Sequence, residues 1–275
     1  MTGNTGDTGD TGDTGDTGDV GGWFGHSIGR LPDRVDLPFL TEPDVASVTM
    51  TRSKFGANNW APSWFAWRIL ADFGVTDWQT SIVVAQPQPP TTVEIETLKT
   101  MVLDERPDAL GEILGQDKEF LPYFLAVMGA TPNTHRATSL VMNAAHLVAT
   151  MAVMHFKTLH DRVRPSQLVP ALLPPIPVPG HASYPSGHST QAHLFARCAT
   201  EILGATPGQG ISLVLTRLAD RIARNREIAG LHYPTDSAAG ASLAADLFTI
   251  LMDDTIMPAP WTFKAAMTAA KSEWV

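Results

Sequence analysis

The stretch from His181 to Ser189 has the composition of an anion-binding site. Its sequence is His-Ala-Ser-Tyr-Pro-Ser-Gly-His-Ser. Pro185 predicts the end of the preceding segment, Ser186 is a favourable N-cap residue, and Gly187 lets a ligand approach the backbone without meeting a Cβ. The first amides of the helix that we expect next have no intrahelical partner and carry the positive end of its dipole. A phosphate-like oxyanion is the natural ligand of such a helix start.

Two cations precede this stretch at a helical spacing. Lys157 stands seven residues before Arg164, and Pro165 follows directly. Seven residues make two helical turns, so we expect both side chains on one face of a helix that Pro165 stops. The simpler alternative is a pair of solvated charges, which a helix C-terminus favours.

A histidine and a carboxylate follow the stretch. His232 and Asp236 are four residues apart, with Pro234 placed for the first turn of a helix. An Asp at this distance can take the imidazole Nδ1 proton and leave Nε2 free as a nucleophile or as a ligand of a metal oxyanion. The alternative is a capping Asp beside a core histidine. Arg226, slightly upstream, could direct a bidentate guanidinium at the same anion.

Together these residues could form one pocket for a tetrahedral or trigonal-bipyramidal oxyanion. The Ser186 hydroxyl and the Gly187 amide would hydrogen-bond the anion, and His232 would bond to its central atom. His188 would face the opposite side as the acid–base group. Such a pocket stabilises charge on equatorial oxygens, as phosphoryl transfer requires. Three cations would neutralise the anion: Lys157, Arg164 and Arg226.

The three segments, from Lys157 to Asp236, resemble the signature of a known superfamily. It joins soluble acid phosphatases, type 2 phosphatidic acid phosphatases and vanadium-dependent haloperoxidases. One departure is Asn225, because the superfamily usually has Ser before the arginine that corresponds to Arg226. Asn can still donate a hydrogen bond, so only a secondary contact is in doubt. The resemblance also implies that vanadate or phosphate can occupy the pocket, and that the chain could form a homodimer.

Two reactions compete within this resemblance. In a soluble acid phosphatase, His232 would attack the phosphorus of a phosphomonoester and form a phosphohistidine, His188 would protonate the leaving alkoxide, and no cofactor would be needed. In a haloperoxidase, His232 would ligate the vanadium of vanadate, Lys157 would polarise bound hydrogen peroxide, and halide, with bromide favoured, would be oxidised. A third hypothesis is a phosphate-binding module without turnover, which would not require His188, His232 and Asp236.

The histidine seven residues before His188 bears on the choice. Bromoperoxidases of the superfamily carry a second active-site histidine at this offset, so His181 could contact the substrate. The alternative for His181 is a loop residue bound to a backbone carbonyl. The sequence from Leu231 to Asp236 is closer to the phosphatases. We favour the haloperoxidase and keep the phosphatase as the alternative.

Composition limits the class of protein. The chain has 28 acidic and 19 basic residues, which argues against nucleic-acid binding, and one cysteine, which excludes an intramolecular disulfide. The N-terminus has neither the basic nor the apolar region of a signal peptide. Asn143 and His146 interrupt the longest apolar tract, Leu140 to Phe156. We therefore expect no membrane span, small-molecule substrates and a soluble, cytoplasmic protein, with non-standard export left open.

Three regions are expected along the chain. Residues 1–22 contain Thr-Gly-Asp repeats and predict a disordered acidic tail, with weak calcium binding as the alternative. Residues 23–90 predict an irregular segment that wraps the core and contains one or two helices. Residues 91–275 predict the helical catalytic core, so the fold class is an all-α bundle. The apolar spacing predicts helices at 63–74, 92–105, 107–128, 133–160, 188–203, 211–229, 237–252 and 261–272.

Overall fold

The computed structural model describes residues 43, 47–49, 61–257 and 263–274. The acidic tail predicted for residues 1–22 and most of the irregular segment predicted before residue 61 lie outside these ranges. The described residues contain helices and no β-strand, which confirms the all-α fold class. The longer helices are α2 (Pro62–Gly74), α4 (Thr92–Asp104), α5 (Arg106–Gly115), α6 (Leu121–Met128), α7 (Arg136–His160), α9 (Gly187–Ile202), α10 (Gly210–Ile228), α11 (Pro234–Leu251) and α12 (Phe263–Lys271). The short ones are α3 (Trp78–Ser81), α8 (Pro165–Leu168), η5 (Pro170–Leu172) and η6 (Ser272–Trp274).

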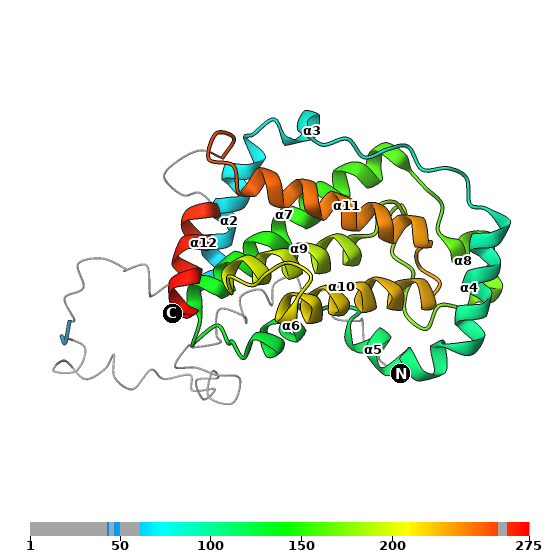
Figure 1. Cartoon of the computed structure of the whole chain (residues 1–275), viewed down its shortest axis with the longest axis horizontal. Helices are drawn as coiled ribbons and strands as arrows, with labels where there is room; N and C mark the ends of the chain where they lie inside the picture. Colours follow the sequence, from blue (N-terminus) through cyan, green and yellow to red (C-terminus); the bar gives the residue numbers. More distant parts are fainter. Residues whose placement is uncertain (1–42, 44–46, 50–60, 258–262, 275) are drawn as a thin grey trace.

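Helix α9 lies at the centre of the bundle. It packs against α7, α10 and α11, and Figure 1 shows it between α10 and α11. Small buried residues such as Ala192 and Ala199 let its neighbours approach closely. Phe195 fills the side toward α6, where its ring meets Phe124 at 5.4 Å. Ser186, Ser189 and Thr190 at its start are fully buried, so the N-terminus of α9 has a fixed position within the core.

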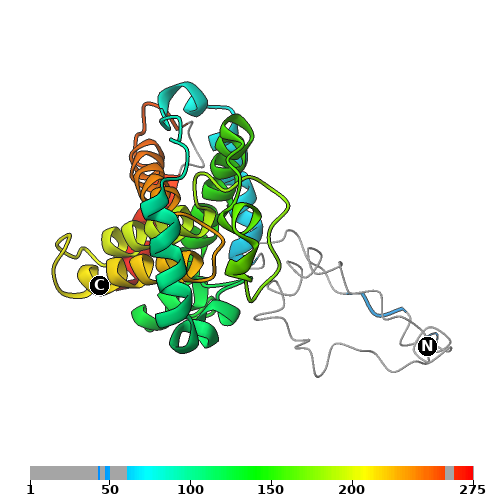
Figure 2. The same cartoon turned by 90° about the vertical axis from the view of Figure 1, so that its right-hand side faces the viewer.

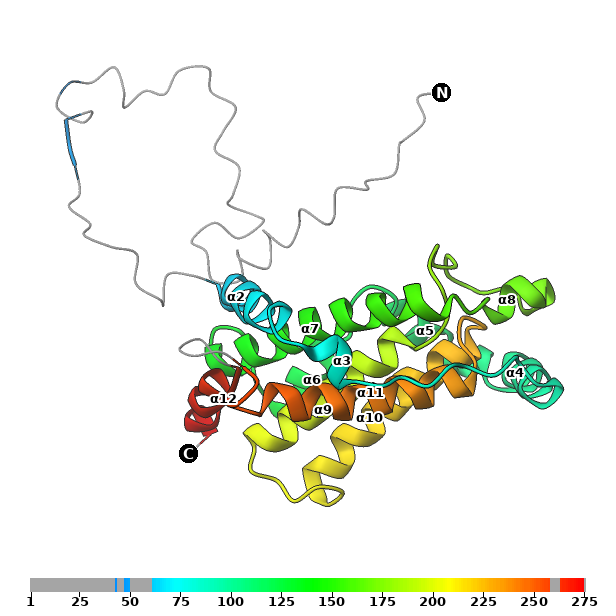
Figure 3. The same cartoon turned by 90° about the horizontal axis from the view of Figure 1, so that it is seen from above.

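One end of the bundle gathers the segments that carry the predicted site. The C-terminal ends of α7 and α10 and the N-terminal ends of α9 and α11 meet where α4 and α8 lie, while α2 and α12 occupy the opposite end (Figures 1 and 3). Seen toward this end, α4 crosses in front of the bundle (Figure 2). Residues far apart in the chain are thus close in space.

Helix α7 ends at the residue that its apolar spacing predicts, and does not run on to Pro165. It stops at His160, because Asp161 adopts a left-handed conformation (φ 41°) and its N–H caps the carbonyl of Lys157. Arg164 is extended (φ −74°, ψ 152°), as the residue before a proline prefers, and forms the N-cap of α8. The prediction that Lys157 and Arg164 share one helix face is therefore wrong.

The helix predicted over residues 107–128 is two helices. Helix α5 ends at Gly115 and α6 begins at Leu121, with Pro122 in its first turn. A proline in that position has no N–H to donate and fits a helix start better than a helix interior. The break leaves carbonyl oxygens at the end of α5 free to accept hydrogen bonds from side chains.

The expectation of no membrane span is wrong. The helical segment Arg136–Leu168 is long and apolar enough to cross a membrane by length and composition, because Asn143 and His146 do not offset its apolar residues. Just over half of its most apolar window is buried inside the fold. The prediction of a soluble, cytoplasmic protein depended on the absence of such a segment and is therefore also wrong.

Candidate functional site

His232 and Asp236 form a buried hydrogen-bonded pair at the start of α11. The imidazole Nδ1 lies 3.2 Å from the carboxylate Oδ2, which also accepts the backbone N–H of Tyr233 at 3.0 Å. A carboxylate only accepts, so Nδ1 carries the proton and Nε2 keeps its lone pair. The pair forms because Asp236 is the third residue of a helix that begins at Pro234, and its side chain folds back over the helix start.

Burial decides the charge of this histidine. Removal from water lowers the pKa of His232 to about 3, in spite of the hydrogen bond that His232 donates to Asp236, and the charges of Lys157 and Arg164 also lower it. Burial alone would raise the pKa of Asp236, but its hydrogen bonds with His232, Ser183 and the Tyr233 amide lower it to about 2. The pair is thus a neutral imidazole beside a carboxylate at any ordinary pH.

Lys157 and Arg164 both donate hydrogen bonds to the loop that precedes α9, and Arg164 also lies beside His232. The ammonium of Lys157 donates to the carbonyls of Ala182 (2.6 Å) and Ser183 (2.9 Å). The guanidinium of Arg164 donates to the carbonyls of His181 and Leu231, each at 3.0 Å, and its Nη1 lies 3.4 Å from His232 Nε2. Both cations are almost fully buried. The structure therefore brings Lys157, Arg164 and His232 together, although not by the shared helix that we expected.

His181 is an exposed neighbour of this cluster. Its Nδ1 lies 3.1 Å from Nη2 of Arg164 and 3.3 Å from the carbonyl of Ala182. Partial burial lowers its pKa, and the charges of Lys157 and Arg164 add to that effect. The contact with a backbone carbonyl matches the structural alternative that we kept open for His181. A contact between His181 and a substrate stays a prediction.

Ser186 and Gly187 form the start of α9, as predicted. Ser186 is fully buried, its Oγ accepts the N–H of Ser189 at 3.4 Å, and its own N–H donates to the carbonyl of Asp236 at 3.0 Å. A Cβ on Gly187 would meet Val153 at 3.6 Å, an ordinary contact. Packing therefore does not require glycine at this position, and the role of Gly187 in admitting a ligand stays a prediction.

Arg226 occupies the break between α5 and α6. Its Nη2 donates to the carbonyl of Ile113 at 2.7 Å, and its Nη1 lies 3.7 Å from the carboxylate of Asp117. Nε and Nη1 are buried without a hydrogen-bond partner among the described residues. Burial lowers the pKa of Arg226 to about 10, so the side chain stays charged. Buried N–H groups without acceptors are costly, and an anion would satisfy them.

His188 lies in the same break. Its Nε2 is 3.0 Å from the carbonyl of Gln116, so Nε2 carries the proton, and its ring stacks on Phe120 at 4.9 Å. Burial and then the charge of Arg226 lower the pKa of His188 to about 3. Among the described residues, no hydrogen bond or ion pair joins Arg226 or His188 directly to His232. Their convergence on one anion with the first cluster stays a prediction, supported by the Ser186–Asp236 bond between the clusters.

Three further residues contact the predicted site residues and were missed by the sequence analysis, two through their side chains and Gln116 through its backbone carbonyl. Ser183 donates to Asp236 at 2.5 Å, and Gln116 supplies the carbonyl that binds His188. Arg162 donates to the other oxygen of Asp236 at 2.6 Å. Of the three, only Arg162 had a signal in the sequence, because it is a cation two residues before Arg164 in the same segment.

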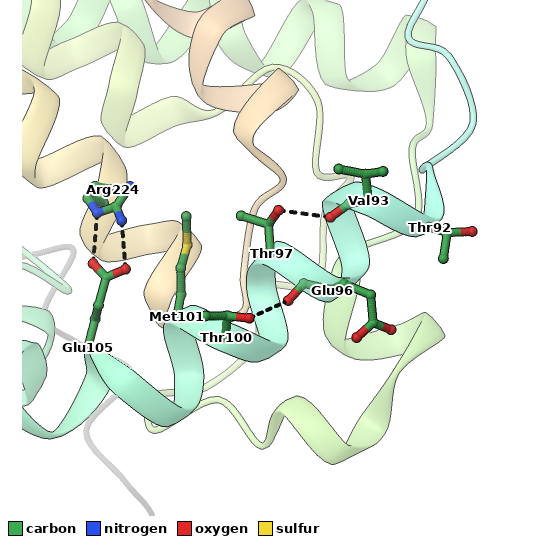
Figure 4. A pocket seen from close by; sticks show the side chains of 8 residues that line it. All are labelled: Thr92, Val93, Glu96, Thr97, Thr100, Met101, Glu105 and Arg224. Carbon is green, nitrogen blue, oxygen red and sulfur yellow. Dashed lines mark hydrogen bonds and ion pairs between the residues drawn. The ribbon is translucent and has the colours of Figure 1, made fainter.

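A surface groove of about 520 Å³ lies beside α4, and none of the predicted site residues lines it. In Figure 4 the ion pair of Arg224 with Glu105 closes one end of the groove. The hydroxyls of Thr97 and Thr100 donate to carbonyls of their own helix. The groove is therefore an open surface feature, and the buried cluster around His232 remains the candidate site.

Comparisons with known proteins place the chain among phosphatases. Decaprenylphosphoryl-5-phosphoribose phosphatases from two strains of Mycobacterium tuberculosis are 31% identical to it over 128 residues, 46% of this chain and 67% of the relative. The crystal structure of a transmembrane PAP2 type phosphatidylglycerolphosphate phosphatase from Bacillus subtilis matches with a TM-score of 0.44 and 19% identity, covering 69% of this chain and 92% of that one. No family model matches the chain.

The three motif segments and the curated relatives agree on one class of protein, that of phosphatases. The chain belongs to the superfamily of type 2 phosphatidic acid phosphatases. The relatives support phosphatase-type chemistry, and nothing in the comparisons supports the haloperoxidase that we favoured from the sequence. Of the two reactions left open by the sequence, phosphate-ester hydrolysis, which we kept as the alternative, is thus the better supported.

Proposed function

We propose that the protein is a phosphohydrolase that cleaves phosphomonoesters through a phosphohistidine at His232. The observation that carries this proposal is the buried His232–Asp236 pair with Arg164 beside it. Asp236 fixes the proton on Nδ1, so the lone pair of Nε2 faces the guanidinium that would bind a phosphoryl oxygen. A neutral, oriented imidazole next to a cation is what attack on a phosphate requires.

The remaining residues have roles in the same proposal. Lys157, Arg164 and Arg226 would bind the phosphoryl oxygens, together with the amides at the start of α9. The unpartnered Nε and Nη1 of Arg226 support this, because a phosphoryl oxygen would supply the acceptors that they lack. The same donors fit vanadate, which resembles the five-coordinate phosphorus of the transition state. Vanadate should therefore bind in this pocket as an inhibitor.

The reaction proceeds in two displacements. The Nε2 lone pair of His232 forms a bond to phosphorus while the bond from phosphorus to the ester oxygen breaks, and the leaving alkoxide takes a proton from His188. A water molecule then attacks phosphorus, returns a proton to His188, and breaks the bond to Nε2. His188 is neutral in the free protein, and a dianionic substrate beside it raises its pKa so that it can hold the proton.

Hydrolysis of p-nitrophenyl phosphate tests the proposal. The wild type should release nitrophenolate with competitive inhibition by vanadate, and His232→Ala should not. His135→Ala is the matched control, because His135 stacks on Trp274 near the start of α7 and away from the cluster. An acid-labile phosphoprotein should form in the wild type and be absent in His232→Ala. Peroxide-dependent bromination by the vanadate-loaded protein, without phosphate release, would overturn the proposal.

A further inference from the structure

Arg162 is a buried cation on the segment between α7 and α8. Its Nη1 donates to Oδ1 of Asp236 at 2.6 Å and to the hydroxyl of Thr235 at 2.8 Å, and its Nη2 lies 3.7 Å from the carboxylate of Glu94. The side chain of Arg162 is 5% exposed and that of Asp236 is 0% exposed. Their interaction is thus removed from solvent, where a charge pair is strong and loss of one partner is costly.

The two oxygens of Asp236 have separate partners. Oδ2 accepts from His232, from the hydroxyl of Ser183 and from the amide of Tyr233. Oδ1 accepts from Arg162 alone among the described residues. Removal of the guanidinium would leave Oδ1 buried without a donor, and the carboxylate would no longer be held in one orientation against the imidazole.

The guanidinium itself has a fixed position. Its central carbon lies 4.2 Å from the centre of the Tyr233 ring, a cation–π contact. Its outer partner Glu94 belongs to the capping box of α4 and also accepts the hydroxyl of Thr235 at 2.6 Å. Partners from α4 and from the start of α11 therefore meet at one side chain of the segment after α7, as a rigid support requires.

We infer that Arg162 is a positioning residue for His232: it holds the Asp236 carboxylate in the orientation that keeps the imidazole proton on Nδ1. The inference rests on the proposed nucleophilic role of His232. The hydrogen bonds of Arg162 Nη1 go to Asp236 and Thr235, so we expect Arg162 to act through Asp236 and not on the phosphate itself. Its loss should slow the chemical step more than it weakens substrate binding.

Removal of the Arg162 charge should also change the titration of His232. Other charged or titratable groups surround the His232–Asp236 pair. Lys157 and Arg164 are cations near His232. Glu227 of α10, Glu94 of α4 and the Tyr184 hydroxyl lie near Asp236 or Arg162. Without Arg162, the negative charge of Asp236 is less compensated and stabilises protonated His232. The acidic limb of kcat/KM, which reports loss of the neutral imidazole, should move to higher pH.

Kinetics of Arg162→Gln and Arg162→Lys test the inference. Arg162→Gln should lower kcat by about 10- to 100-fold, with KM little changed and the acidic limb shifted upward, and Arg162→Lys should recover part of kcat. Arg224→Gln is the matched control, because it removes an arginine that pairs with Glu105 on the surface, and it should behave as the wild type. A wild-type kcat in Arg162→Gln, or an effect on KM alone, would overturn the inference.

Nitrogen NMR of His232 separates this inference from the proposed function. The His232 signals are assigned by their loss in His232→Ala, and they report which ring nitrogen carries the proton even if the protein hydrolyses no test ester. The wild type should show the proton on Nδ1, and Arg162→Gln a mixture. If Arg162→Gln does not fold, Arg162→Lys decides: an unaltered tautomer together with an unaltered pH profile contradicts the inference.

Discussion

The backbone of Gly240 on α11 touches Ser186 at the start of α9, so closely that a Cβ on Gly240 would lie 2.6 Å from the Ser186 carbonyl oxygen and 2.9 Å from the Cβ of Ser189. No side-chain rotation can relieve a contact with a backbone atom. Gly240→Ala should therefore destabilise the fold by about 1–3 kcal/mol and shift the N-terminus of α9 relative to His232. Urea unfolding and hydrolysis of p-nitrophenyl phosphate measure the two effects.

Gly111 provides the control for this substitution. It lies inside α5, and a Cβ there would have no atom within 4 Å. Gly111→Ala should stabilise the protein by about 0.5–1 kcal/mol, since alanine favours a helix interior. Equal stability changes in the two variants would contradict the close contact between α9 and α11.

Gly187 should be required for activity more than for stability. Because a Cβ on Gly187 would make only an ordinary contact with Val153, Gly187→Ala should unfold at nearly the same urea concentration as the wild type. Its methyl group would stand where a phosphoryl oxygen approaches the first amides of α9, so KM should rise and vanadate should bind more weakly. Normal inhibition by vanadate in a folded Gly187→Ala would show that the anion binds elsewhere.

Asp236→Asn tests the orientation of the nucleophile. An asparagine has the same shape, but its amide can present N–H to Nδ1 and stabilise the opposite tautomer, with the proton on Nε2. We expect kcat to fall on the order of 10⁴-fold, as for other buried Asp–His pairs, while phosphate and vanadate still bind to the cations. A kcat near that of the wild type would remove Asp236 from the proposed mechanism.

Stability should fall as the pH decreases from about 6.5 to about 3. The folded-state pKa values of His188 and His232 are about 3, below the value of about 6.5 in an unfolded chain. Within this window the unfolded state binds more protons, so each histidine removes up to about 1.4 kcal/mol of stability for each unit by which the pH decreases. The low pKa of Asp236 acts in a more acidic range, since its stabilisation persists until the pH falls below about 3.8 and is lost through its pKa of about 2.

Urea unfolding between about pH 4 and pH 7 measures this slope. His188→Gln should have a shallower pH dependence than the wild type, because one buried histidine no longer resists protonation. His135→Ala serves again as the control. A slope that does not change in His188→Gln would mean that His188 can be protonated in the folded protein.

The sequence predicted the helices well where apolar spacing and end signals agreed. Helix α9 begins one residue before the predicted start at His188, with the expected Ser186 cap, and α2 ends at the expected Gly74. The break within residues 107–128 was missed, although Pro122 was a visible signal for it. The turn that separates Arg164 from α7 had no comparable signal, because Asp161 adopts a left-handed conformation that glycine, and not aspartate, usually indicates.

The site was predictable as a set of residue types and not as a network. Lys157, Arg164, His232 and Asp236 could be chosen because their side chains are chemically distinctive and regularly spaced. Several partners of the site residues are backbone carbonyls, which any residue could supply: those of Ala182 for Lys157, Leu231 for Arg164 and Gln116 for His188. The expectation of no membrane span was wrong for a related reason. It rested on two polar residues, Asn143 and His146, whereas the mean hydropathy of the segment Arg136–Leu168 depends on all of its residues.

The segment that joins α7 to α8 alternates between inside and outside. Arg162 and Arg164 are buried and Val163 between them is 46% exposed, so both guanidinium groups face the same way, as in an extended strand. Arg162 donates a hydrogen bond to Asp236, and Arg164 lies beside His232. Deletion of Val163 would place the two arginines at adjacent positions, where an extended segment points side chains to opposite sides. Only one guanidinium could then face inward, so either the support of Asp236 or the contact with His232 would be lost although no helix is shortened.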